Sequence, residues 1–512
     1  MKKYFRKKIT GGVFLGFFVS TSVVSAALPE PCAAGAQLKA PAAVLSDLTV
    51  KVELMGTMPT VDVANNLASP VAYKHNEMFL IDQANANLYS YCTSDKVSKC
   101  KNGTRLNQIF YTADVPPSLG APGGNRGAEA IINVVGNHAE NKVYIAFTAT
   151  IRPTSIPVHD LPFPDEPSGG KEDFIYIDGS QDAFYNTNNG SGPLIDRDIY
   201  RIDAPDFAIF GSPVPMRDQY HVIYKYDYIN GVLNNPEAIL ALANQGGPNH
   251  AGGGMSLTPD GHILYTTGDN LPFGMNGRKA PQDDSTIVSK LLIIDPDTAA
   301  VTVAAKGLRN VQHIQKTTKP AGIIFADIGG VTAEEVNFIS WDDLLDTSEI
   351  ENFGWGNSDP SDPNGGREGT YKITAGLPLV LGVAPAACME ADQPEAGYRQ
   401  PLAQFGRSVL HTFVFVAASG PVVSNKSFKN ISMIYGDLPS GELYATTAKI
   451  DGRDEELFAL KVVDENLNSL PGGLFQLGLG GRVDPRFFLF PDGTAGVLLE
   501  ATGDFYRLTE VD

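Results

Sequence analysis

The stretch NHAGGGMSLTPDGHILYTTGD, residues 249–269, contains two short apolar runs on either side of a PDG turn. Pro, Asp and Gly supply the backbone angles that a tight turn needs, so the stretch is predicted to form a β-hairpin. His250 lies ten residues before Asp260, and Asp269 lies nine residues after it. A regular antiparallel hairpin therefore brings His250 diagonally close to Asp269 at its open end.

A neutral imidazole held by a carboxylate has one nitrogen fixed as donor and the other left as acceptor, which is what a general base requires. The chain places both groups at one end of the predicted hairpin, so His250 is a candidate base and Asp269 its orienting acid. The alternative is a structural histidine that is hydrogen-bonded at a strand end. The run AGGG (251–254) carries almost no side chains and is predicted to let a large group approach the backbone.

Short apolar runs of this kind recur along the chain, each bounded by Gly, Pro, Asn or Asp. They are KVYIAFTA (142–149), HVIYKYDY (221–228), HILYTTGD (262–269), KLLIIDPD (290–297), GIIFADIGG (322–330), ELYATTA (442–448) and DFYRL (504–508). With 52 Gly and 35 Pro in 512 residues, and no long helical period, the chain is predicted to be all-β. A single β-propeller over residues 27–512 fits best, because radial repetition hides sheet edges. We expect six blades, although seven or eight are also compatible with the sequence.

Residues 151–219 interrupt this pattern with PTSIPVHDLPFPDEPSGG and NTNNGSG. We expect a long loop insertion over one face of the propeller, where loops build binding sites. A separate small domain is the alternative.

The N-terminus has a basic head, MKKYFRKK, followed by an apolar stretch and small residues. This order predicts a signal peptide over residues 1–26, and hence a bacterial protein that is secreted or periplasmic and not stably inserted in the membrane. The net charge is −19, and loss of the five basic residues of the signal peptide takes it to −24. Such acidity disfavours nucleic acid as a partner.

An oxidising compartment permits disulfides among the four cysteines. Cys92 and Cys100 enclose only seven residues and are predicted to form a local loop clamp. Cys32 and Cys388 would then pair with each other.

Downstream of the hairpin, five features occur in a specific order. They are the Gly-rich strand start containing His250, the PDG turn with a strand that ends in GD, GLRN (307–310), GGVTAEEVN (329–337) and NFGWG (352–356). In this order they resemble the soluble quinoprotein glucose and aldose sugar dehydrogenases, the glucose/sorbosone dehydrogenase family. The detailed resemblance covers about residues 245–356.

The resemblance implies a six-bladed propeller that binds pyrroloquinoline quinone and Ca²⁺ on one face. It makes His250 the base that removes a sugar hydroxyl proton and Asp269 its orienting residue. Arg309 and Asn310 match positions that contact the quinone, and the resemblance also makes Arg309 a catalytic residue. The carbonyls of Gly329 and Gly330 match calcium ligands, with Glu335 as a further acid for a metal and Glu334 beside it. Phe353 and Trp355 match an aromatic turn that is expected to serve packing.

The sequence departs from the family pattern at the quinone. Pro439, in GDLPSGELYATT (436–447), stands where a lysine is expected, and in GRVDPRFFLFPDG (481–493) only Arg482 aligns with a cofactor arginine, although Arg486 could substitute for a second. The expected function is oxidation of an aldose or related sugar hydroxyl, with a separate electron acceptor. Two alternatives remain: a metal-dependent hydrolase of lactonase type that uses Asp327, Glu334 and Glu335, and a propeller that binds carbohydrate or protein without catalysis.

Overall fold

The structure is a computed structural model that describes most of the chain between residues 44 and 511. The described ranges are 44–59, 67–83, 85–116, 131–149, 158–159, 208–209, 212–213, 220–243, 250–269, 280–282, 284, 287–329, 333–346, 348–356, 366–368, 371–373, 389–390, 397–406, 418–447, 449–450, 457–478 and 483–511. The predicted signal peptide, Cys32, Cys388, Gly330, Arg482 and nearly all of 151–219 lie outside them.

Four sheets of four or five strands form consecutive meanders along the chain. The first contains β2 (Val71–Lys74), β3 (Glu77–Asp82), β4 (Asn87–Cys92) and β5 (Leu106–Phe110). The second contains β6 (Ile131–Asn137), β7 (Lys142–Ala149), β11 (Tyr220–Ile229), β12 (Val232–Ala243) and β8 (Val158–His159). The third contains β13 (Gly252–Leu257), β14 (Ile263–Thr267), β15 (Lys290–Ile294), β16 (Val301–Lys306) and β20 (Glu351–Asn352). The fourth contains β17 (Ile314–Thr318), β18 (Ala321–Asp327), β19 (Ala333–Ser340) and β24 (Ala403–Gly406).

The C-terminal strands form one eight-stranded sheet together with the first strand. Its members are β25 (Ala418–Val422), β26 (Met433–Asp437), β27 (Leu443–Thr446), β28 (Phe458–Val463), β1 (Val44–Thr57), β31 (Asp504–Val511), β30 (Ala495–Leu499) and β29 (Pro485–Leu489). Strand β1 pairs in parallel with β28 and antiparallel with β31. The prediction of six separate blades is therefore not confirmed. Four meanders are separate sheets, and hydrogen bonds on both edges of β1 merge the remaining strands into one.

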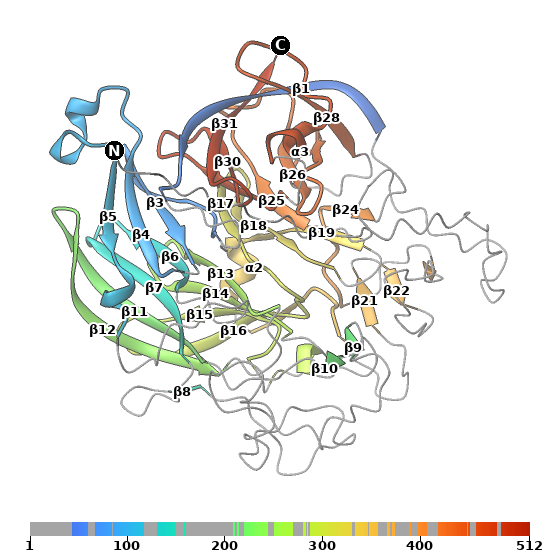
Figure 1. The fold of residues 1–512 in the computed structure, drawn as a ribbon. Coiled ribbons are helices and arrows are strands. Elements are labelled where there is room, and N and C mark those ends of the chain that lie inside the picture. The colour runs from blue at the N-terminus through green and yellow to red at the C-terminus, as the bar shows by residue number, and fades with distance from the viewer. Residues whose placement is uncertain are drawn as a thin grey trace.

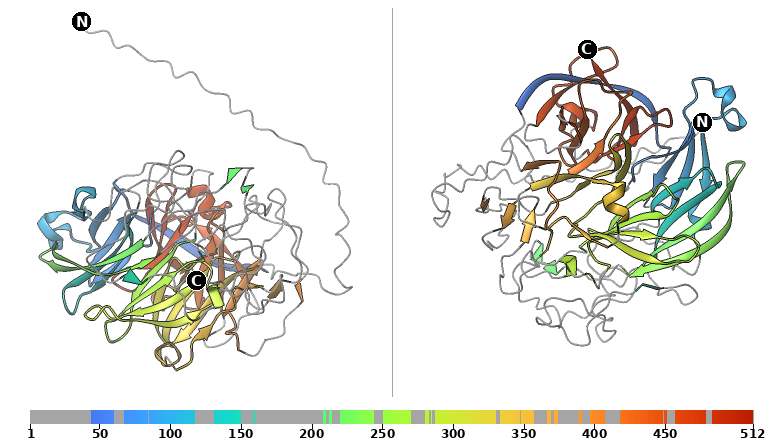
Figure 2. Two further views of the ribbon diagram at one scale, coloured as in Figure 1. Left: turned by 90° about the horizontal axis from the view of Figure 1, so that it is seen from below. Right: turned by 180° about the vertical axis from the view of Figure 1, so that it is seen from behind.

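The meanders follow one another around a common centre in chain order, which is a propeller-like arrangement (Figure 1). Strand β6 contacts β2 and β13, strand β13 contacts β17, and strand β29 contacts both β25 and β2. The view from behind shows the same circular order, with the first strand lying against the last ones (Figure 2, right). The predictions of an all-β chain and of a propeller are confirmed at this level.

Shorter elements decorate these sheets. Among the described residues, the helices are α2 (Trp341–Leu345) and α3 (Gly473–Leu477), and the 3₁₀ turns are η1 (Val97–Lys99), η2 (Lys101–Gly103), η3 (Thr112–Asp114) and η8 (Ala280–Gln282). Two small sheets contain β9 (Ala208–Ile209) with β10 (Ser212–Pro213), and β21 (Gly366–Glu368), β22 (Tyr371–Ile373) and β23 (Met389–Glu390). Within the described residues, no helix is long and apolar enough to cross a membrane.

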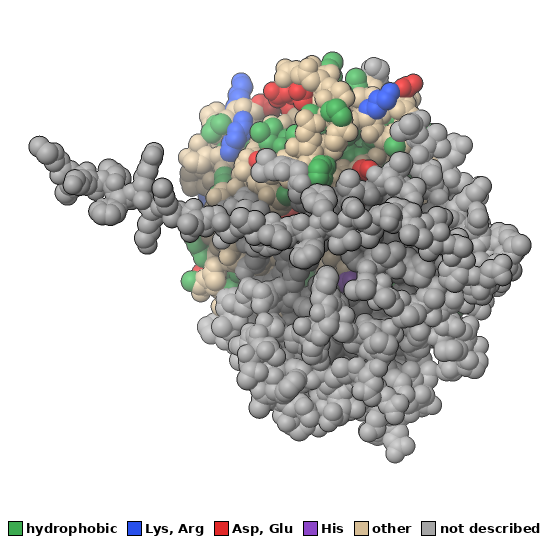
Figure 3. Space-filling view, turned by 45° about the vertical axis from the view of Figure 1, so that its right-hand side comes forward, with side chains coloured by type: hydrophobic (Ala, Val, Ile, Leu, Met, Phe, Trp, Pro, Cys, Tyr) green, Lys and Arg blue, Asp and Glu red, His purple; other side chains and the backbone are tan. Residues whose placement is uncertain are grey.

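Every apolar run singled out in the sequence falls in a strand of a main sheet. Runs such as KLLII in β15 are buried throughout, because both faces of the strand are packed against other residues. Their sequences are therefore continuously apolar and do not alternate between apolar and polar residues. On the described part of one face, acidic, basic and apolar side chains are mixed (Figure 3).

The disulfide predicted between Cys92 and Cys100 is confirmed, with 5.7 Å between the Cα atoms. It joins the end of β4 to the 3₁₀ turns before β5.

The connection from β7 to β11 contains the predicted insertion. Ala149 ends β7 directly opposite Tyr220, which begins β11. The connection therefore leaves and re-enters the sheet at one end, as a loop insertion requires, and the insertion itself lies outside the described residues apart from three two-residue strands.

Strand β1 gives a direct test of how the sheet closes. Val52 is 3% exposed and packs in the core shared with the C-terminal strands, whereas Leu54 on the same strand is 53% exposed. We expect Val52→Ala to lower the free energy of unfolding by roughly 2 kcal/mol, between the costs typical of Ile→Val and Leu→Ala. Leu54→Ala should change it by less than about 0.5 kcal/mol. Denaturant titration of both variants checks this. An equal loss of unfolding free energy in the two variants would contradict the buried position of Val52 in β1.

Candidate functional site

His250 and Asp269 meet at the open end of the predicted hairpin. His250 precedes β13 and Asp269 follows β14, and the pairs Gly252 with Thr267 and Leu257 with Ile263 set the register. The His250 Nδ1 atom lies 3.1 Å from Asp269 Oδ1. The proximity predicted from the spacing of these residues is confirmed.

The glycine run beside His250 is needed for the protein's own backbone. The register shifts between Gly252 and Met255, and Gly252 and Gly253 have φ values of 74° and 91°. A Cβ on Gly252 would lie 2.7 Å from the backbone nitrogen of Gly268. The glycines therefore allow the backbone at the end of β14 to approach closely. The register shift is a β-bulge, which changes the direction of the chain next to His250.

Arg309 and Asn310 lie in a turn between β16 and β17, and the carboxylate of Asp327 binds the backbone of this turn. Asp327, at the end of β18, accepts hydrogen bonds from the backbone N–H of Arg309 at 2.8 Å and of Asn310 at 2.6 Å. The turn is also tied to the hairpin, because Asp269 N–H donates to Arg309 O at 2.9 Å and Gly252 N–H donates to Asn310 Oδ1 at 3.2 Å. Three strand ends from two sheets are fixed relative to one another.

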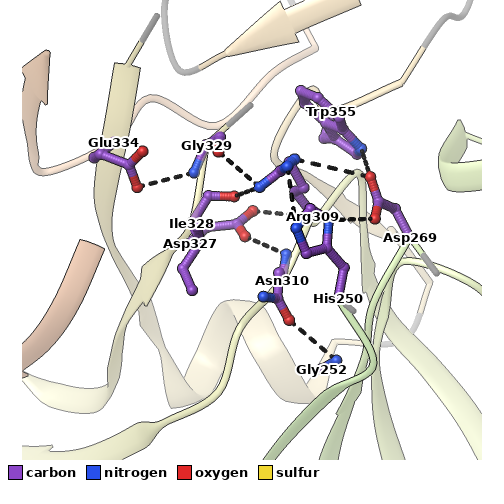
Figure 4. Close-up of polar contacts among 10 residues, drawn as sticks. All are labelled: His250, Gly252, Asp269, Arg309, Asn310, Asp327, Ile328, Gly329, Glu334 and Trp355. Atoms are coloured by element: carbon purple, nitrogen blue, oxygen red, sulfur yellow. Dashed lines mark hydrogen bonds and ion pairs between the residues drawn. The ribbon is translucent and has the colours of Figure 1, made fainter. Parts of the chain in front are cut away.

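The Arg309 side chain lies at the centre of the site (Figure 4). Its Nη1 donates to the carbonyl oxygens of Ile328 at 2.7 Å and Gly329 at 2.6 Å. Its Nη2 lies 3.3 Å from His250 Nε2, and its Nε lies 3.9 Å from Asp269 Oδ2. The guanidinium also stacks over Trp355, 5.3 Å from the ring centroid. Arg309 therefore contacts both the candidate base and the predicted metal-binding carbonyl.

These contacts fix the tautomer of His250. Arginine stays protonated and can only donate, so His250 Nε2 must be the acceptor in their contact. The proton of the neutral ring is then on Nδ1, which donates to Asp269. The His250 side chain is 15% exposed and that of Asp269 is fully buried. A ring held in this way has the oriented acceptor nitrogen that a general base requires, if a substrate hydroxyl replaces Arg309 at Nε2.

Trp355 has a role that the sequence did not predict. Its Nε1 donates to Asp269 Oδ2 at 3.1 Å, so it holds the second oxygen of the carboxylate that orients His250. Phe353 does serve packing, as predicted, since it is 2% exposed and meets Phe325 edge to face. The one available signal was that a buried indole N–H needs an acceptor.

A second histidine, His221, lies within hydrogen-bonding distance of the hairpin's Tyr265. His221 Nδ1 is 2.7 Å from the Tyr265 hydroxyl, and burial lowers the pKa of His221 to about 3. His221 is therefore a neutral core residue in β11, and His250 is the histidine at the candidate site.

The described residues of the predicted calcium site have other hydrogen-bond partners, and Gly330, the second predicted carbonyl ligand, lies outside the described residues. The Gly329 carbonyl oxygen is occupied by Arg309, while Glu334 accepts from the backbone N–H groups of Gly329 at 3.0 Å and Ala418 at 2.7 Å. Glu335 lies opposite Asp327 and accepts from Asn337. Within the described residues, no group of three or more His, Cys, Asp or Glu could hold a metal.

The positive charge of Arg309 also disfavours a calcium ion at the Gly329 oxygen. A calcium ion about 2.4 Å from the Gly329 oxygen would lie no more than about 5 Å from Arg309 Nη1. At an effective dielectric constant of about 20, charges of +2 and +1 at that distance repel by roughly 7 kcal/mol.

The predicted quinone contacts are only partly within the described residues, since Arg482 is outside them. Pro439 lies buried in the turn between β26 and β27, where its carbonyl accepts from Val483 N–H at 3.2 Å. Arg486 donates to Gln312 at 2.7 Å and Glu500 at 2.8 Å. The Arg309 guanidinium beside His250 does fit an anionic acceptor, because a partly buried positive charge suits carboxylate and carbonyl oxygens.

Comparisons with known proteins were made by sequence and by structure. No family model and no curated protein matches the chain. Among solved structures, the quinone-bound aldose sugar dehydrogenase from Streptomyces coelicolor is 14% identical with a TM-score of 0.48, over 90% of this chain and 99% of that one. The apo soluble aldose sugar dehydrogenase from Escherichia coli is 13% identical with a TM-score of 0.48, over 90% and 99%. The holo pyranose dehydrogenase quinone domain from Coprinopsis cinerea is 11% identical with a TM-score of 0.44, over 92% and 99%. These are proteins of the kind that the sequence motifs resemble.

The Asp327 carboxyl gives the site a pH dependence of defined sign. Burial raises the pKa of Asp327 to about 6, and the hydrogen bonds from Asn310 and Arg309 oppose that rise. An acid whose pKa is higher in the folded than in the unfolded state loses stabilising free energy as pH rises through the folded value. The free energy of unfolding of the wild type, relative to that of Asp327→Asn, should therefore fall between pH 4 and pH 7 by on the order of 3 kcal/mol.

Denaturant titrations at several pH values measure this difference. The control is Asp297→Asn, because the Asp297 side chain is 85% exposed. The control should follow the wild type at every pH. A difference between wild type and Asp327→Asn that does not change with pH would mean that the backbone N–H groups keep Asp327 ionised throughout.

Proposed function

We propose that the protein is an oxidoreductase of the quinoprotein type that oxidises an aldose or related sugar hydroxyl, with pyrroloquinoline quinone as hydride acceptor. The observation that carries the proposal is the position of His250, with Nδ1 on the buried Asp269 and Nε2 3.3 Å from the Arg309 guanidinium. A base and a fixed positive charge on one side of a reacting oxygen suit removal of a hydroxyl proton with loss of hydride from the same carbon.

In this proposal His250 acts through Nε2. The sugar hydroxyl replaces Arg309 as the hydrogen-bond partner of Nε2 and gives up its proton there. Asp269 keeps Nδ1–H in place and stabilises the imidazolium that forms, as a buried carboxylate does for a catalytic histidine. Trp355, which donates to the other oxygen of Asp269, prevents that carboxylate from rotating.

Arg309 supplies the positive charge for the same step. Its Nη2 lies beside Nε2, so an oxygen bound at His250 also lies next to the guanidinium. The bound quinone would supply a carbonyl able to accept two electrons and a proton as hydride. The hydroxyl proton goes to His250 and the hydride goes to the acceptor, so the alcohol carbon becomes a carbonyl. Calcium assistance, which the resemblance implies, is not part of this proposal.

The two alternatives fit the geometry less well. A lactonase-type hydrolase needs Asp327, Glu334 and Glu335 to converge on one ion, but Asp327 and Glu334 each accept two backbone N–H groups and so serve the fold. A purely binding propeller gives no reason for a buried carboxylate to fix the tautomer of His250.

The architecture and location expected from the sequence complete the proposal. We propose six blades: the eight-stranded sheet would then be two four-stranded blades, β25 to β28 and β29 to β31 with β1, joined where β1 pairs in parallel with β28. Residues 151–219 belong to the connection between the end of β7 and the start of β11, which lie opposite each other, and we propose that they select the substrate. We also propose export through residues 1–26, where a basic head is followed by an apolar stretch, operation in the periplasm or outside the cell, and transfer of electrons to a separate acceptor.

The role of His250 predicts a specific loss. His250→Ala should lower dye-linked aldose oxidation, in protein reconstituted with pyrroloquinoline quinone, by about 10²- to 10⁴-fold, because general base catalysis typically contributes that much. Quinone affinity, measured by calorimetric titration, should change by less than about twofold. Equal loss of quinone binding and turnover would show that His250 holds the cofactor and is not the base.

The same hairpin provides the control for this experiment. His262 follows the PDG turn, with a side chain that is 38% exposed and faces the carboxylate of Asp260 at 3.4 Å. His262→Ala removes a histidine from the far end of the hairpin and should leave turnover unchanged. If neither quinone nor calcium plus quinone gives any aldose oxidation, the proposed function is wrong.

Asp269 can be tested independently. Asp269→Asn keeps the shape but permits the amide to donate to His250, which moves the ring proton to Nε2 and removes the acceptor. Turnover should fall by about 10⁴-fold, as when the wrong tautomer is imposed on another carboxylate–histidine pair. Asp260→Asn, which alters the exposed carboxylate–histidine pair at the turn, should have no effect on turnover. Full activity of Asp269→Asn would show that Asp269 does not fix the tautomer.

A further inference from the structure

The position of a positive charge in this site differs from what the sequence motifs imply. The resemblance places a calcium ion on the carbonyl oxygen of Gly329. In the structure that oxygen accepts a hydrogen bond from Arg309 Nη1 at 2.6 Å, and the same nitrogen donates to Ile328 O at 2.7 Å. A guanidinium therefore makes the oxygen contacts that a hard cation would make.

The guanidinium is held there from several directions. Asp327 accepts a hydrogen bond from the backbone N–H of Arg309, and the guanidinium carbon lies over the Trp355 ring. The side chain is 10% exposed, and its Nε lies 3.9 Å from Asp269 Oδ2. Side chains from other segments of the chain thus hold the guanidinium at the Gly329 oxygen, and a metal bound to that oxygen would lie beside this positive charge.

We propose that the Arg309 guanidinium takes the place of calcium in this protein. It holds the Ile328 and Gly329 carbonyl oxygens and supplies the positive charge beside His250, so that no divalent cation is needed at this site. The structural half of this inference concerns only which cation the carbonyls hold. The catalytic half rests on the proposed function: Arg309 stabilises negative charge on the oxygen that loses its proton to His250, or on the acceptor oxygen that gains charge with the hydride.

The structural half can be tested on the apo protein with a luminescent calcium analogue. The chain has two tryptophans, Trp341 and Trp355, and only Trp355 stacks on Arg309. Terbium(III) bound at the Gly329 oxygen would lie near Trp355 and show emission sensitised by it. We expect emission from the wild type to be no greater than that from Trp355→Phe, with Trp341→Phe as the matched control for loss of a tryptophan elsewhere.

The opposite result is equally clear. Sensitised emission from the wild type that calcium displaces, that Trp355→Phe abolishes and that Trp341→Phe leaves intact would place a metal beside Arg309 and overturn the inference.

The catalytic half is tested on protein treated with a chelator and reconstituted with pyrroloquinoline quinone. Calcium should change quinone affinity and aldose oxidation by less than about twofold. Arg309→Met should lower turnover on the order of 100-fold, the cost typical of losing one donor to a developing charge, and calcium should not restore it. Arg309→Lys keeps the charge but not the planar fork, and should retain more activity than Arg309→Met.

Activity that appears only with calcium would overturn the catalytic role of Arg309. Absence of quinone-dependent turnover under all conditions would overturn the proposed function instead. The terbium result would still decide which cation holds the carbonyl oxygens, so the two failures are distinguishable.

Discussion

The site depends on one buried carboxylate. Asp327 accepts the backbone N–H groups of Arg309 and Asn310, and that turn in turn accepts hydrogen bonds from Asp269 N–H and Gly252 N–H. Burial disfavours the charge on Asp327, as its raised pKa indicates, while the two N–H groups would otherwise be buried without partners. The carboxylate and the two N–H groups become each other's partners when the end of β18 lies against the turn before β17. The same turn is hydrogen-bonded to the hairpin that carries His250, so His250 and Arg309 are held close together.

The closing of the chain by β1 sets this arrangement within the molecule. Strand β1 bonds to β28 on one edge and β31 on the other, so the N-terminal strand completes the sheet made by the last part of the chain. Strands β13 and β17 of neighbouring meanders contact each other, and His250 and Arg309 lie in the segments that lead into those strands. The site is consequently a product of the closed ring as well as of its local motifs.

Sequence reasoning succeeded where the determining contacts are local. The hairpin that pairs His250 with Asp269 follows from counting residues around Asp260, and the Cys92–Cys100 disulfide follows from their short separation.

Sequence reasoning failed where contacts connect distant segments. The merging of two meanders through β1 depends on pairing between residues about 410 apart, and the Trp355 bond to Asp269 spans 86 positions. Neither leaves a periodic pattern in the chain, because periodicity reports which face of an element is buried and not what covers it. The direction of the Arg309 side chain was equally hidden, since its motif specifies a turn and not the carbonyls that the guanidinium reaches.

Arg309 and Asp269 act in opposite directions on a proton at His250 Nε2. The guanidinium, 3.3 Å from that nitrogen, opposes a second positive charge there, whereas the carboxylate at 3.1 Å from Nδ1 favours it. With both neighbours in place the acceptor nitrogen is occupied by a donor that cannot lose its proton. A hydroxyl that displaces Arg309 from Nε2 weakens the opposing influence at the moment when the base is needed, and leaves the guanidinium next to the oxygen on which negative charge develops. Binding of the hydroxyl and activation of the base would then be one event, because the same guanidinium contact governs both.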